Sequence, residues 1–204
     1  MTLAPTPPIP RGRKAEQSDR TRAALLTVAR SLFAERGYAG AATEEVVQQA
    51  GVTRGALYHH FRDKQDLFEA VFVEVQEEVR AGIRAASQAQ PDAWSAFRAG
   101  FGEYLNRSMD PAVQGILFRD APVVLGWERW REVDVCLVMI QNGLGALVRA
   151  GVVSPSFPVD EFAHLLRGVA SEAAHMIASA PDAAAERRRT GEAVGQILEG
   201  IRGR

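Results

Sequence analysis

A short segment of this 204-residue chain gathers side chains that can bind anions and the edges of nucleic-acid bases. They are Thr53, Arg54, Gly55, Tyr58, His59 and His60. Hydroxyl, imidazole and guanidinium groups donate hydrogen bonds to phosphate oxygens, and a guanidinium also binds the O6 and N7 atoms of guanine. The glycine among them allows close approach by a partner. Such a surface is unusual for a helix that has only a structural role.

Two short helices joined by a tight turn are needed to position these side chains. The first helix is expected to begin with Thr43 as its N-cap and to end at Gly51, where glycine accepts a positive φ. The second begins with Thr53 as N-cap and runs to about residue 59. Leu57 and Phe61 are the apolar positions that would hold it against neighbouring helices. This pattern predicts a helix-turn-helix.

The remaining sequence is also helical in pattern, with no alternating strand pattern to compete. One helix is expected to start near Arg20 and to end at Gly37, and another to start after the N-cap Asp63. Further helical stretches lie at about 92–108, 111–119, 127–150, 159–179 and 183–202. The sequence therefore predicts an all-α fold of about nine helices.

Composition and charge exclude several classes of protein. Hydrophobic residues make up 47% and charged residues 24% of the chain, which excludes a disordered protein, and no run of eighteen apolar residues predicts a membrane span. Residues 1–64 contain ten Lys or Arg and six Asp or Glu, whereas residues 65–204 contain fourteen and nineteen. A balance of +4 before a balance of −5 suggests that the first part meets a polyanion, although chance variation also explains it. Cys136 is the only cysteine, so no intrachain disulfide is possible, and a cytoplasmic location is expected.

The N-terminal end is expected to be a disordered basic arm over residues 1–19. Four prolines within residues 1–10 favour an extended chain, and Arg11, Arg13 and Lys14 follow them. Residues 1–10 also lack an apolar core and a cleavage signature, which argues against a secretion signal. Such an arm could follow a DNA backbone or enter a minor groove, or it could be a solvated tail.

The stretch over residues 21–71, and most specifically AGVTRGALYHHFRDKQDLF, resembles the TetR family of bacterial transcription regulators. The resemblance implies an all-α homodimer with an N-terminal DNA-binding domain, here residues 20–66, and a ligand-binding and dimerisation domain, here residues 67–204. It also implies repression from a near-palindromic operator on double-stranded DNA and release by a small-molecule effector. It implies no enzymatic activity and no cofactor.

The resemblance and the helix-turn-helix assign DNA contacts to Thr43, Thr53, Arg54, Gly55, Tyr58, His59 and Lys64. Arg54 is expected to bind guanine, with a phosphate contact as the alternative. Thr43 either binds phosphate or only caps its helix. Lys64 matches a lysine that binds phosphate, and its place at a helix N-terminus is unfavourable for the helix dipole. That placement indicates a role other than folding.

The last two helical stretches are expected to form the dimer interface. Their apolar positions are Leu166, Val169, Ala170, Ala173, Val194, Ile197, Leu198 and Ile201. Small residues among them favour close approach of helices, although packing within one subunit would give the same pattern. A two-fold dimer would place two recognition helices about 34–36 Å apart, one turn of DNA.

Large apolar residues in the middle of the chain are candidates for an effector pocket. They are Phe97, Phe101, Tyr104, Phe118, Trp127, Trp130 and Met139, with His175, Asn142 and Arg119 as candidate polar partners. Helical bundles bind ligands between helices, but a stripe of this kind can also be plain core. Arg119 could instead pair at the surface with Asp120 or Glu128. An apolar or aromatic effector is expected.

Two other functions fit parts of the sequence. Glu161-x-x-His164 and Glu172-x-x-His175 are similar to the motif of di-iron bundles. Both motifs lie on one helix, about 16 Å apart, so one subunit cannot close a two-metal site from them. No metal site is therefore expected, and a site across a dimer axis stays open as an alternative. A DNA-binding regulator without any effector is the other alternative.

Overall fold

The computed structural model describes residues 12–132 and 135–202, and within these ranges every regular element is a helix. The elements are α1 (Arg13–Gly40), α2 (Thr43–Gln49), α3 (Arg54–His60), α4 (Lys64–Gln88), α5 (Ala93–Arg107), α6 (Pro111–Val113), the π-helix η1 (Gln114–Asp120), α7 (Ala121–Val124), α8 (Trp127–Glu132), α9 (Val135–Arg149), α10 (Val159–Ser179) and α11 (Ala183–Glu199). The predicted all-α fold is confirmed. None of the described helices is both long and apolar enough to span a bilayer.

The helix boundaries follow local side-chain chemistry. Thr53 Oγ1 accepts the backbone N–H of Ala56 at 3.2 Å, and Asp63 Oδ1 accepts that of Asp66 at 2.8 Å. These contacts satisfy N–H groups that have no partner inside their own helices. The turn before α3 contains Gly51 at φ +65°, as its position between two helices predicts.

Two expectations about helix starts are wrong. Thr43 is the first residue of α2 and not its N-cap, and its hydroxyl lies 3.2 Å from the carboxylate of Glu44 instead. Helix α1 begins at Arg13, so residues 13–19 are helical and not a disordered arm. That segment contains Lys, Ala, Glu and Gln, which favour helix, and lacks proline and glycine. Residues 1–11 lie outside the described part of the chain.

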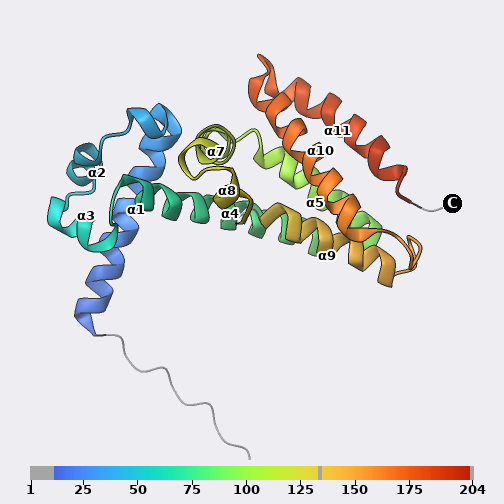
Figure 1. Ribbon diagram of the computed structural model, residues 1–204, viewed down its shortest axis with the longest axis horizontal. Helices are drawn as coiled ribbons and strands as arrows, with labels where there is room; N and C mark the ends of the chain where they lie inside the picture. The colour runs from blue at the N-terminus through green and yellow to red at the C-terminus, as the bar shows by residue number, and fades with distance from the viewer. Residues whose placement is uncertain (1–11, 133–134, 203–204) are drawn as a thin grey trace, which may run out of the picture.

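Helices α1 to α3 form one end of the molecule, and α5, α9, α10 and α11 form a bundle at the other (Figure 1). Helix α4 belongs to both, because it starts beside α3 and runs along α5. Its 25 residues extend roughly 37 Å at 1.5 Å per residue. The short segment α6–η1–α7 packs against α1 and α4 where the two parts meet.

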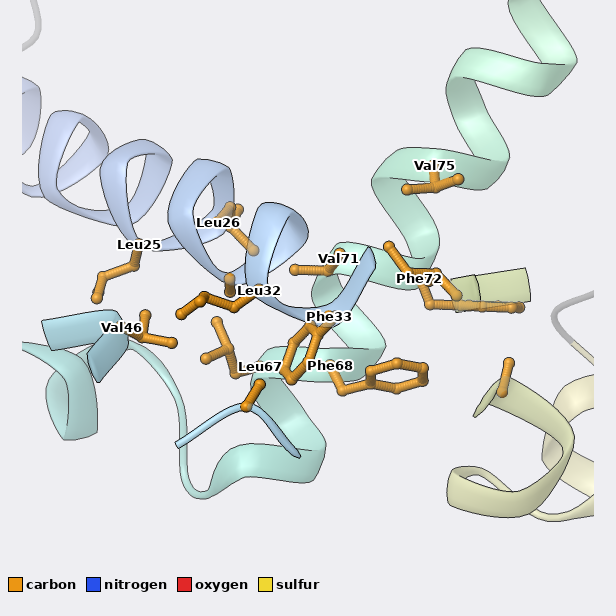
Figure 2. Packing of buried hydrophobic residues seen from close by; sticks show 14 of the residues in the cluster. Leu25, Leu26, Leu32, Phe33, Val46, Leu67, Phe68, Val71, Phe72 and Val75 are labelled. Atoms are coloured by element: carbon orange, nitrogen blue, oxygen red, sulfur yellow. The ribbon is translucent and has the colours of Figure 1, made fainter. Parts of the chain in front are cut away.

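Two hydrophobic cores hold these parts together. In the first, α1 and α4 interlock through fully buried side chains such as Leu32, Phe33 and Phe68, as Figure 2 shows. This core also includes apolar residues of the α6–η1–α7 segment, among them Ile116 and Leu117. The second core joins α5, α9, α10 and α11. The core therefore does not divide at residue 66, where the sequence placed the domain boundary.

Candidate DNA-binding surface and internal cavity

Helix α3 has one face that packs in the core and another that exposes polar side chains to solvent. Its inward residue Leu57 is fully buried, and Phe61 at its end is buried against the same core. The predicted DNA-contacting residues of this region lie on the other face and are exposed: Thr53, Arg54, Gly55, Tyr58 and His59. The sequence placed these side chains correctly because burial of Leu57 fixes the rotation of a helix this short.

The Arg54 side chain is 70% exposed and is held only by weak surface contacts. Its guanidinium lies 3.6 Å from the Glu44 carboxylate and 5.5 Å from the centre of the Tyr58 ring. The pKa of Glu44 lies below its usual value because its own backbone N–H and the Thr43 hydroxyl donate to the carboxylate. An exposed ion pair of this kind is worth about 0–1 kcal/mol, so Arg54 is easily redirected to another partner.

Lys64 is half-buried at the start of α4 and is oriented by an aromatic ring. Its Nζ atom lies 4.5 Å from the centre of the Tyr38 ring, within the range of a cation–π contact. Burial lowers the pKa of Lys64. The pKa of Tyr38 is raised, mainly by burial and to a lesser extent by the negative charge of Asp63. The ammonium group is therefore held over the Tyr38 ring at the N-terminal end of α4, the helix that follows α3 in the chain.

The Tyr38 backbone also connects this surface to the π-helix. Its N–H donates to Asp120 Oδ2 at 2.7 Å, and Arg119 donates to both oxygens of the same carboxylate at 2.9 and 3.2 Å. Arg119 therefore takes the predicted surface pairing with Asp120 and does not line a cavity. Tyr38 and Asp120 are 82 positions apart, and no local sequence signal predicts their contact.

A cavity of about 510 Å³ lies between α4, α5 and α9. Four of the residues expected to bind an effector line it: Phe97, Phe101, Tyr104 and Met139. The rings of Phe97 and Phe101 meet edge to face, with their centres 5.7 Å apart. The volume of the cavity falls in the range of small-molecule sites, about 300–1,000 Å³. Asn142 lines it too, as a candidate polar partner.

The other expected pocket residues lie elsewhere. Phe118 and Trp130 line a separate hollow of about 40 Å³ beside η1, together with Tyr104 and Met139. His175 is exposed on α10 and lines neither space. It was predicted wrongly because α10 buries Ala173, Ala174 and Ile177, which turns position 175 towards solvent. The side chain of Trp127 lies outside the described part of the chain.

Comparison with known proteins matches both parts of the chain to one family. The model of the bacterial regulatory proteins of the tetR family matches residues 25–71, and that of the tetracyclin repressor-like C-terminal domain matches residues 94–201. The second match alone covers more than half of the chain. The chain belongs to the TetR family. The resemblance found in the helix-turn-helix therefore extends over most of the sequence.

Individual TetR-family proteins agree with this assignment. The crystal structure of a regulator from Pectobacterium atrosepticum is 36% identical, covers 95% of this chain and 99% of that chain, and superposes with a TM-score of 0.79. The Tn10 TetC protein of Escherichia coli is 30% identical over 54% of this chain and 56% of that protein. The repressor BepR of Brucella suis is 47% identical over 28% of this chain and 27% of its own length. The chain thus spans about half or less of these two relatives.

Most residues that the sequence predicted at the dimer interface of this TetR-family chain are not accessible to a partner subunit. Six of the residues expected at the dimer interface are already buried in their own subunit: Leu166, Ala170, Ala173, Val194, Leu198 and Ile201. They pack within the second core, so the prediction is wrong for them. Val169 is half-buried, and Ile197 is 47% exposed. Leu165 and Met176, 66% and 45% exposed, lie on the outer face of α10 instead.

The two Glu-x-x-His motifs lie on the outer face of α10. Glu161, His164, Glu172 and His175 are all exposed. Among the described residues, no group of three or more His, Cys, Asp or Glu side chains is arranged to hold a metal ion.

Proposed function

We propose that this TetR-family regulator binds a near-palindromic DNA operator as a homodimer and represses transcription there. We further propose that a small molecule in the 510 Å³ cavity releases it from DNA. The observation that carries the proposal is that α3 buries one face in a closely packed core and exposes polar side chains on the other. Leu57 fixes the helix and leaves Arg54 and Tyr58 exposed to meet bases and phosphates, with Lys64 following at the start of α4.

The outer faces of α10 and α11 support dimerisation. Leu165, Gly168 and Met176 follow one another at helical spacing on α10, and Ile197 is exposed on α11. Exposed large apolar side chains that share a helix face are typical of surfaces covered by another protein. A two-fold axis through these helices would present both copies of α3 to successive turns of DNA, about 34–36 Å apart.

A continuous series of contacts supports release by a ligand. Tyr104 lines the cavity and meets Phe118 of η1 edge to face, with ring centres 6.3 Å apart. Two residues further along, at the last residue of η1, Asp120 accepts the backbone N–H of Tyr38, and the Tyr38 ring lies against Lys64. A ligand that favours another position of Tyr104 would shift η1 and with it the phosphate-binding lysine.

Selection of duplexes from a random DNA pool at low salt tests the proposal. We expect recovery of a sequence with two-fold symmetry, bound by a dimer in gel shift and analytical ultracentrifugation. Affinity should fall steeply with salt, because much of the binding is to phosphates. A double change, Leu165→Glu with Ile197→Glu, should give monomers with weak DNA binding. A wild-type chain that stays monomeric, or that binds no duplex in dilute buffer, would contradict the proposal.

A further inference from the structure

One wall of the 510 Å³ cavity is basic. Helix α4 supplies Arg80, Arg84 and Ser87 to the lining, and none of the described lining residues is Asp or Glu. The opposite wall is apolar and comes mainly from α5 and α9. Two guanidinium groups, with no carboxylate among the lining residues that the structure describes, are complementary to an anion, and the apolar wall is complementary to a hydrophobic body.

The two arginines have unused hydrogen-bonding capacity. Arg80 pairs with Glu77 through one terminal nitrogen, but its Nε–H is buried without a hydrogen-bond partner. Arg84 is exposed, and the described residues give it no ion pair. The two side chains are one helical turn apart, a spacing at which like charges repel. Leaving a buried donor without an acceptor is also unfavourable. A carboxylate bound between the two arginines would relieve the repulsion between their charges.

The apolar wall is shaped closely around an aromatic ring. The Cβ of an alanine at position 143 would lie 2.6 Å from the Phe97 ring, so glycine there is what allows Phe97 its present place. Phe97 and Phe101 then present their rings to the cavity. Such a wall suits a flat or flexible apolar group of modest size.

We infer that the cavity binds a small apolar or aromatic carboxylate, with its carboxylate held by Arg80 and Arg84 and its apolar body against Phe97 and Phe101. The inference deepens the proposed function, since this ligand would be the effector. Hydrogen bonds between a guanidinium and a carboxylate are charge-assisted and often bidentate, so the charge of the ligand should dominate its selection.

Binding of matched probes to the full-length wild-type protein tests the inference. The pairs are 2-naphthoate with 2-naphthamide and 4-phenylbutyrate with 4-phenylbutanamide, measured by isothermal titration calorimetry. We expect at least one carboxylate to bind about tenfold more tightly than its amide. If an amide binds as tightly as its carboxylate, or if neither carboxylate binds at millimolar concentration, the inference is overturned.

Three variants and one control test whether Arg80 and Arg84 select the charge of the ligand. Arg80→Met and Arg84→Met should each weaken carboxylate binding about tenfold while leaving amide binding within about twofold. Arg98→Met is the matched control, because Arg98 pairs with Glu199 and does not line this cavity. Arg84→Glu, at an exposed position, should instead favour 2-naphthylmethylamine over 2-naphthoate. Unchanged carboxylate affinity in both methionine variants would overturn the inference.

The selected DNA duplex separates this inference from the proposed function. If the wild-type dimer binds its duplex but does not discriminate carboxylates from amides, only the inference fails. If it binds carboxylates in the cavity but no duplex, only the proposed function fails. A carboxylate that binds and also lowers affinity for the duplex, with both effects lost in Arg84→Met, supports the two together.

Discussion

The two hydrophobic cores of this protein differ in how completely they are filled. In the first, Phe68 is fully buried and meets Phe33 and Tyr38 edge to face, with ring centres 5.2 and 5.3 Å away. In the second, Phe97 and Phe101 border a cavity of about 510 Å³. The filled core supports side chains that act on its outside. The side chains that we propose for ligand binding instead line a space inside the second core, so the two proposed sites differ in how the fold positions them.

The largest expected difference between the cores is in stability. Phe68→Ala should lower the free energy of unfolding by about 3–5 kcal/mol, because it removes a ring from a closely packed site. Phe97→Ala should cost less, because it enlarges an existing space. Thermal unfolding at one protein concentration compares them. An equal or larger loss for Phe97→Ala would show that the second core is as tightly packed as the first.

The outer face of the first core should show two separable kinds of DNA contact. Arg54→Ala should relax preference at one or two base positions, a loss of about 1–3 kcal/mol of discrimination. Lys64→Ala should weaken binding to all sequences alike and reduce the salt slope by about one. Titrations against selected and scrambled duplexes measure both effects, and the reverse pattern would overturn the assignment of roles.

The link between the two regions should contribute a smaller amount. Asp120→Ala removes the acceptor of the Tyr38 N–H and should lower the free energy of unfolding by about 1–2 kcal/mol. Asp120→Asn keeps a carbonyl acceptor and serves as the control, with a smaller loss expected. If Asp120→Ala leaves both stability and DNA affinity at the wild-type level, the contact does not couple the regions.

The smallest expected effect is a loss of stability at low pH that arises from His60 in the DNA-binding end. Burial lowers the pKa of His60, and the charges of His59 and Arg22 lower it further. The unfolded chain therefore takes up a proton first on acidification. The stability associated with neutral His60 is complete above its usual pKa of about 6.5 and is lost as the pH falls through the lower folded value. His60→Gln should flatten the decline of the melting temperature on acidification, and His59→Gln serves as a comparison. An unchanged decline in His60→Gln would contradict this.

Sequence reasoning worked best where structure depends on near neighbours. The caps at Thr53 and Asp63 and the turn at Gly51 act within four residues, so the helix-turn-helix and its exposed face could be predicted. Of the residues expected at the dimer interface, Leu166 is buried in its own subunit, whereas the neighbouring Leu165 is exposed. Apolar spacing shows that a helix has a buried side, but it does not show whether the cover comes from the same chain or from a partner.

The cavity could be predicted only in part, because it depends on distant segments. Phe97, Phe101 and Tyr104 were expected from their size and class. Arg80 and Arg84 were missed because charged residues late in a long helix look like an ordinary solvated face. Only the packing of α9 against α4 and α5 makes these arginines part of a cavity wall.

Helix α4 is one unbroken rod from Lys64 at one end to Arg80 and Arg84 towards the other. In the proposed function, it would act as a lever that joins the ligand-binding cavity to the DNA-binding surface. A tilt of about 5° over its length would move the lysine end by roughly 3 Å, the length of one hydrogen bond. Under that proposal, a small tilt of α4 caused by ligand binding would be sufficient to move Lys64 away from a phosphate.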